Sequence, residues 1–118
     1  MDVQRIQALL SDFARERKWD QFHTPKNFAT AVVCKAGELA EIFQWMTDSQ
    51  SEKVMGDLRL AEDIRDEMAD VFLYLIRLAD KLSVDLEAAM LTKIQKNGEK
   101  YPVSHSRGSA EKYSRRRI

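Results

Sequence analysis

The segment DLRLAEDIRDEMADVFLYLIRLADKL, residues 57–82, decides the fold class of this chain. It contains neither Gly nor Pro, and its apolar residues become denser toward its C-terminal half. This pattern predicts one long helix that is nearly buried all round. Because such a helix needs other helices to cover it, the flanking sequence should supply them.

Two helices are predicted before this segment. Residues 2–17 place apolar side chains every three to four positions, which is the spacing of an amphipathic helix. A second helix should run over residues 25–46, because Thr24 is a suitable N-cap and Pro25 fits the first helical position. The loop between them, KWDQFHTP, interrupts the apolar pattern with aromatic and polar residues.

A fourth helix should follow the long segment, in the stretch SVDLEAAMLTKIQKNG. Ser83 or Asp85 caps its start, and Asn97-Gly98 is expected to end it. No strand-like alternation is present. The sequence therefore predicts an all-α protein, a four-helix bundle with short connections.

The composition narrows the possible classes of protein. A chain of 118 residues is expected to form one domain, and no run approaches the roughly 18 apolar residues that span a bilayer. The N-terminus lacks the apolar core of a signal peptide, so we expect a cytoplasmic protein without a membrane partner. The single cysteine, Cys34, excludes an intrachain disulfide, and its neighbours AVV predict that it is buried.

The charges are distributed unevenly along the chain. Residues 103–118 carry five Lys/Arg against one Asp/Glu, which leaves 14 against 18 in residues 1–102. We therefore expect a helical domain over residues 1–102 and a flexible basic tail over residues 103–118. Nucleic-acid binding by five scattered cations is the less favoured alternative.

Two pairs of acids stand out inside the apolar helices. Glu38 and Glu41 are three residues apart, as are Glu67 and Asp70, so each pair occupies one side of its helix. If the two helices lie side by side, the pairs can face each other and offer the oxygen ligands that Mg²⁺ or Mn²⁺ prefers. The alternative is that both pairs are ordinary features of a solvated surface.

Four segments, WDQFHTPKNFA, GELAEIFQW, DEMADVFLYLIRLADKL and KIQKNGEKYP, together resemble the MazG-like all-α nucleoside triphosphate pyrophosphohydrolases. The resemblance is closest to the dCTP pyrophosphatase branch of that family. It implies a helical bundle that assembles as a homodimer or homotetramer. It also implies cleavage of a (d)NTP, dCTP or a related pyrimidine nucleotide, to NMP and pyrophosphate, for nucleotide-pool sanitation; dUTP or a damaged nucleotide is a second option.

The resemblance also implies a Mg²⁺ site, with Mn²⁺ as a substitute. Glu67 and Asp70 match one expected ligand pair, and Glu38 matches half of the other, but the remaining ligand position holds Lys35. A lysine can pair there with Glu38, Asp70 or a phosphate. Three outcomes stay open: weakened metal binding with residual activity, rescue by Glu41 as a substitute ligand, or loss of catalysis that leaves a nucleotide-binding or interaction protein. Glu41 is also the candidate to accept the proton of the attacking water.

The substrate contacts implied by the resemblance fall into three groups. Aromatic and imidazole side chains enclose the base, with amides at its edge; tyrosines line the sugar region; and polar or cationic side chains meet the phosphates. The aromatics have a simpler alternative as core or interface residues, and the lysines as solvated surface groups. In chain order the candidates are Trp19, Phe22, His23, Asn27, Gln44, Trp45, Tyr74, Lys93, Asn97, Lys100 and Tyr101.

Overall fold

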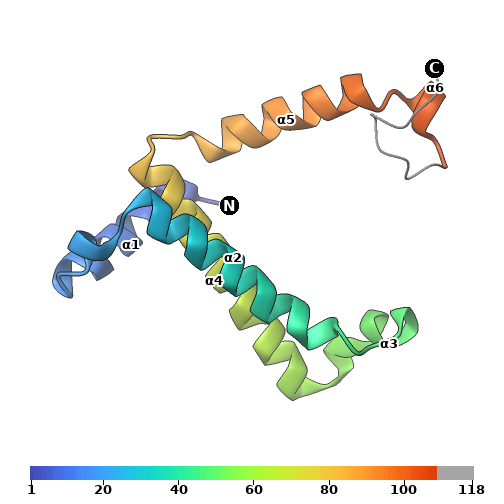
Figure 1. The fold of residues 1–118 in the computed structure, drawn as a ribbon, viewed down its shortest axis with the longest axis horizontal. Helices are drawn as coiled ribbons and strands as arrows, with labels where there is room; N and C mark the ends of the chain where they lie inside the picture. Colours follow the sequence, from blue (N-terminus) through green and yellow to red (C-terminus); the bar gives the residue numbers. More distant parts are fainter. Residues whose placement is uncertain (109–118) are drawn as a thin grey trace. The chain divides into compact units, whose positions relative to one another are not determined.

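The structure, a computed structural model, describes residues 1–108 and contains only helices over that range (Figure 1). The predicted all-α class is therefore confirmed. The chain divides into two compact units, residues 1–84 and the part from Asp85 onward, and each is described here by itself. The predicted boundary between residues 102 and 103 stays a prediction.

The first unit consists of three longer helices joined by short helical turns. In chain order its elements are α1 (Val3–Glu16), η1 (Asp20–Phe22), α2 (Pro25–Phe43), α3 (Asp48–Glu52), η2 (Val54–Gly56) and α4 (Leu58–Lys81). The second unit contains α5 (Leu86–Lys100) and the one-turn helix α6 (Val103–Ser106). Of the basic tail predicted for residues 103–118, positions 109–118 lie outside the described residues.

Side-chain caps fix where the main helices begin. The Thr24 hydroxyl accepts a hydrogen bond from the Asn27 N–H, with Pro25 at the first helical position, as predicted for α2. Asp57 caps α4, and Asp85 caps α5 by accepting from a backbone N–H in the first turn. Of the two caps considered for the fourth helix, Asp85 is therefore the one used.

The predicted end of the fourth helix at Asn97-Gly98 is wrong. Helix α5 passes through Gly98 and ends at Lys100, and the Tyr101 N–H closes the last turn on the Asn97 carbonyl at 2.8 Å. Gly98 has no positive φ, so it does not form a left-handed cap. The helix instead ends just before Pro102, because a proline disfavours helical geometry in the residue that precedes it.

The core of the first unit lies where α2 runs along α4, while α1 contacts α4 more briefly (Figure 1). Phe28 of α2 is 2% exposed, and Ile64 and Ile76 of α4 are 5% and 1% exposed. Ala61 and Ala79 are also buried, so their small side chains allow neighbouring elements to approach α4 closely. Burying one large apolar side chain stabilises a fold by about 1.5–3 kcal/mol.

Two predictions of burial are wrong for the single chain. Cys34 is exposed, and beside it Val33 is 72% exposed, because α4 covers only one side of α2. Helix α4 is not buried all round, since Met68 and Phe72 remain exposed on it. Among the described residues, no helix has the length and apolar character that crossing a membrane requires.

Candidate functional site

A lysine connects the acidic faces of α2 and α4. The Lys35 ammonium lies 3.1 Å from Glu38 Oε2, one turn along α2, and 3.4 Å from Asp70 Oδ2 on α4. These contacts hold the pKa of Lys35 well above its usual range, mainly through the bond to Glu38 and then that to Asp70. Lys35 is therefore charged at neutral pH, and it forms two of the pairings that its position in the sequence allowed.

Glu67 lies beside these residues and completes an acidic cluster of Glu38, Glu67 and Asp70 around Lys35. Its Oε2 is buried and has no hydrogen-bond partner within residues 1–108. Burial, followed by the bond to the neighbouring Glu38, raises the pKa of Glu67 above its ordinary value. Lys35 acts oppositely on Glu38, lowering the pKa of that carboxyl. In this cluster Glu38 and Asp70 are thus paired with Lys35, whereas the carboxyl of Glu67 is costly to ionise.

The family resemblance implies a Mg²⁺ ion at this cluster. In the described part of the chain, no three His, Cys, Asp or Glu side chains are grouped so that they could hold a metal ion. The position between Glu38 and Asp70 is taken by an ammonium, which carries only donors. Mg²⁺ needs several oxygen ligands at short distance, so this arrangement does not fit it.

An aromatic cavity of about 350 Å³ adjoins the cluster, because Asp70 belongs to both. Four of its rings lie next to one another in succession. The ring centroids of Trp19 and His23 are 6.4 Å apart, those of His23 and Phe28 are 4.8 Å apart, and those of Phe28 and Tyr74 are 6.4 Å apart. A flat aromatic ligand can stack or pack edge-on in such a cavity. The full lining is Leu10, Phe13, Ala14, Trp19, His23, Phe28, Asp70, Leu73, Tyr74 and Arg77.

His23 contributes a polar group to the aromatic part of the cavity wall. Its Nδ1 is buried and lacks a hydrogen-bond partner among the described residues. Burial is the main reason why the pKa of His23 is lowered from 6.5, with Arg77 and Lys81 lowering it further and Asp20 opposing them. A neutral imidazole at pH 7 can donate from one nitrogen and accept at the other, which suits contact with the edge of a base.

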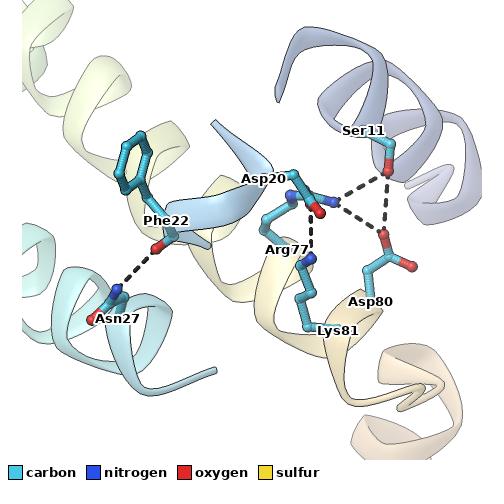
Figure 2. A network of polar contacts seen from close by, with 7 residues as sticks. All are labelled: Ser11, Asp20, Phe22, Asn27, Arg77, Asp80 and Lys81. Carbon is cyan, nitrogen blue, oxygen red and sulfur yellow. Dashed lines mark hydrogen bonds and ion pairs between the residues drawn. The ribbon is translucent and has the colours of Figure 1, made fainter. Parts of the chain in front are cut away.

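The cavity has a charged wall that the sequence reading missed. Arg77 is 7% exposed, and its guanidinium donates to Asp20 at 2.8 Å, to Ser11 Oγ at 3.2 Å and to Asp80 at 3.5 Å (Figure 2). Lys81 donates to the same Asp20 oxygen at 2.7 Å. This Arg77 network joins α1, η1 and α4. Its signal in the sequence was an arginine inside the apolar run VFLYLIRLA.

Several predicted site residues of the first unit lie outside the cavity and the cluster. The Asn27 amide donates to the Phe22 carbonyl at 2.8 Å, so it holds the loop before α2 (Figure 2). The Phe22 ring is 60% exposed and Trp45 is 89% exposed. Glu41 is exposed as well. Their roles in binding or catalysis stay predictions.

The residues predicted to meet the phosphates belong to the second unit. Lys93, Asn97 and Lys100 are on α5, and Tyr101 caps its C-terminal end. Because Lys93 and Asn97 are four residues apart in one helix, they share a face. Their contact with phosphates stays a prediction.

Comparison with known proteins gives mammalian relatives and an archaeal structure. The chain is 42% identical over 113 residues to dCTP pyrophosphatase 1 of Rattus norvegicus, and 41% identical to that of Homo sapiens. Each match covers 96% of this chain but 65% of the mammalian protein, so the chain spans about two thirds of its relatives' length. A pyrophosphatase from Archaeoglobus fulgidus has a similar structure, with a TM-score of 0.77 and 34% identity over 86% of this chain and 94% of that one.

A family model described as MazG-like matches residues 31–115. This range begins on α2, just before Lys35, and takes in the whole of α4 and α5. It covers most of the chain, and the archaeal structure agrees with it at the level of the fold. The chain therefore belongs to the MazG-like family.

Proposed function

We propose that this protein is a nucleoside triphosphate pyrophosphohydrolase that cleaves dCTP or a related pyrimidine nucleotide to the monophosphate and pyrophosphate. The observation that carries the proposal is the cavity beside the charged cluster, which Trp19, His23 and Asp70 all line. The names of the mammalian relatives support dCTP as the leading substrate.

The cavity suits the base of such a nucleotide. Its aromatic walls offer stacking surfaces, and each stacked base is worth about 1–3 kcal/mol. Stacking does not discriminate among bases, so the unpartnered Nδ1 of His23 is our candidate for reading the base edge. With the base in the cavity, the triphosphate would extend toward the charged cluster, since Asp70 is common to both.

The reaction adds water across the bond between the α and β phosphates. The water oxygen bonds to the α phosphorus, the bond to the bridging oxygen breaks, and pyrophosphate leaves with its electron pair. We assign the proton of the water to Glu67 rather than Glu41, because the Oε2 of Glu67 is buried with no partner in residues 1–108 and Glu41 is exposed. The nucleotide is expected to arrive as its Mg²⁺ complex, with the ion bound to the phosphates.

Hydrolysis of a nucleotide panel tests this proposal. The chain would be incubated with each canonical dNTP and NTP in Mg²⁺ buffer, and monophosphate and pyrophosphate would be separated by chromatography. We expect dCTP to be cleaved fastest; faster cleavage of dUTP or of an oxidised pyrimidine would change the substrate but keep the reaction. Release of inorganic phosphate in place of pyrophosphate would contradict it.

The variant Trp19→Ala tests whether the cavity holds the base. We expect nucleotide binding to weaken about five- to a hundredfold, because one stacking surface is lost. Met55→Ala is the matched control, since Met55 is apolar, exposed and absent from the cavity lining. Equal affinities for the parent and both variants would exclude the cavity as the base site.

A second candidate function follows from Lys35. If the ammonium between Glu38 and Asp70 blocks the chemistry, the chain binds nucleotides in the cavity without cleaving them. Calorimetry would then detect dCTP binding by a parent chain that shows no turnover. We also propose that the chain forms a homodimer or homotetramer, because Val33, Met68 and Phe72 expose apolar surface on α2 and α4. The compartment that we propose is the cytoplasm. Light scattering coupled to size-exclusion chromatography measures that assembly.

A further inference from the structure

The acidic cluster differs from a metal site in one respect, which is the cation that it already contains. Lys35 bridges α2 to α4, with its ammonium 3.1 Å from Glu38 and 3.4 Å from Asp70. We propose that this ammonium is the permanent cation of the cluster, so that the chain holds no divalent ion between these carboxylates until Lys35 is replaced. The inference rests on the proposed function only for its consequence for catalysis.

The geometry explains why the ammonium and a divalent ion exclude each other. The ammonium uses one donor on a carboxylate of each helix, and its side chain is 27% exposed, so it is partly removed from water. A divalent ion coordinated by the same oxygens would lie within a few ångströms of the ammonium. Their repulsion grows with the product of the two charges and is screened little in a partly buried site.

The surrounding carboxylates would favour a divalent ion once the lysine is removed. Glu38, Glu67 and Asp70 all belong to the cluster, and Glu67 keeps a buried oxygen with no partner in the described chain. Position 35 is one turn before Glu38 on α2, so a carboxylate introduced there would join the same side of the helix. Lys35→Glu therefore changes an internal cation into a further oxygen ligand.

Holding an ammonium in place of a divalent ion has a chemical cost for this chain. An ammonium brings one positive charge and hydrogen-bond donors, which can orient a phosphate. It cannot lower the pKa of a bound water as a divalent ion does, nor bridge the oxygens of a triphosphate at fixed geometry. Under the proposed function, the parent should turn over slowly and Lys35→Glu should be faster.

Titration with Mn²⁺ alone tests the inference directly. Electron paramagnetic resonance counts free and bound Mn²⁺ without any nucleotide present, so the result does not depend on activity. We expect Lys35→Glu to bind one Mn²⁺ per chain at least about tenfold more tightly than the parent. Lys35→Gln removes the ammonium without adding a carboxylate, so its affinity should lie between the two.

Lys26→Glu is the matched control. It makes the same change of charge on the same helix, at an exposed position outside the cluster, and should leave Mn²⁺ binding at the level of the parent. Circular dichroism checks that each variant is folded. A parent that binds one Mn²⁺ as tightly as Lys35→Glu would overturn the inference, as would a folded Lys35→Glu and a folded Lys35→Gln that both bind no better than the parent.

The outcome for the proposed function is read separately. If Lys35→Glu gains the Mn²⁺ site but cleaves no nucleotide, the internal-cation inference stands and the hydrolase proposal fails. If the parent binds Mn²⁺ tightly and cleaves dCTP, the hydrolase proposal stands and the inference fails.

Discussion

The acidic cluster and the Arg77 network contact α4 at positions seven residues apart, Asp70 and Arg77. They differ in how far their charges are balanced. The Arg77 network pairs two cations, Arg77 and Lys81, with the carboxylates of Asp20 and Asp80. The acidic cluster contains one cation, Lys35, and three carboxylates, and Glu67 keeps one oxygen without a hydrogen-bond partner in the described chain. The first is a balanced set of contacts between helices, and the second has an excess of negative charge.

The difference separates a stabilising role from a functional one. Balanced partners satisfy a buried cation, which would otherwise be costly, so the Arg77 network is expected to stabilise the junction of α1, η1 and α4. The acidic cluster instead contains a buried carboxylate oxygen without a partner in the described chain, which is a cost to folding, and folds keep such costs where function needs them. Opposite responses to mutation should follow in the two regions.

The largest expected effect is that of Arg77→Ala. The change removes a side chain that is 8% exposed, its contacts with Asp20, Ser11 and Asp80, and its packing over the Phe28 ring at 5.7 Å. We expect the free energy of unfolding to fall by about 3 kcal/mol, as measured by urea denaturation.

The control for this variant is Arg65→Ala on the same helix. Arg65 is exposed, so its removal should change the free energy of unfolding by less than about 0.5 kcal/mol. If both variants lose the same stability, helix propensity rather than the network explains the result for Arg77.

The start of each main helix could be predicted from the sequence, because the signal is local. Thr24 with Pro25 and the aspartate at position 85 each cap a helix through groups within four residues. The end of α5 was mispredicted, since Gly98 permits a stop but Pro102 imposes one. The exposure of Cys34 could not be predicted, because apolar periodicity does not say which side of α2 its neighbour covers.

The candidate site was predictable where residue type alone indicated the chemistry. The acids on the two helices and the lysine between them were anticipated, and the structure brings Lys35 to both Glu38 and Asp70. The cavity wall was anticipated only in part. Arg77 was not predicted, because an arginine inside the apolar run VFLYLIRLA indicates burial but does not indicate its partners, which lie 57 and 66 residues away.

A second prediction concerns the anchor of the Arg77 network. Asp20→Asn keeps the side-chain size but removes the charge that Arg77 and Lys81 share, so the protein should lose stability at pH 7. The loss should be smaller than for Arg77→Ala, because Arg77 keeps Ser11 and Asp80. The urea midpoint measures both.

The pH dependence of this effect has a definite sign. Bonds from Lys81 and then Arg77 lower the pKa of Asp20 below 3.8, so its contribution is present above pH 3.8 and is lost as the pH falls through the folded pKa. The difference between parent and Asp20→Asn should therefore shrink under acid. A difference that grows under acid would show that Asp20 does not act through its charge.

A third prediction concerns His23, which lines the cavity together with Asp70 of the cluster and Arg77 of the network. Burial lowers the pKa of His23 from 6.5, so the unfolded chain gains its proton first as the pH falls. The stability contribution present above pH 6.5 should therefore be lost as the pH falls through the folded pKa. His23→Leu should show a smaller drop in melting temperature between pH 7.5 and pH 5.5 than the parent. His105→Leu is the control at the other histidine, which is exposed, and should keep the parent's pH dependence.

The smallest effect, and the one of opposite sign, is expected at Glu67. Burial and Glu38 raise the pKa of Glu67 above 4.5, so the folded state holds its proton more tightly than the unfolded state does. The cost of ionising it is absent below pH 4.5 and grows as the pH rises through the folded pKa. Glu67→Gln removes that cost, and should raise the melting temperature slightly at pH 7.5 and leave it unchanged at pH 4. Glu62→Gln, at an exposed position of α4, should do neither.

Neutralising a carboxylate would then destabilise the Arg77 network at Asp20 but stabilise the cluster at Glu67. Destabilisation by both substitutions would instead mean that the cluster is as balanced as the network. Loss of dCTP cleavage in the more stable Glu67→Gln would identify the Glu67 carboxylate as one retained for chemistry.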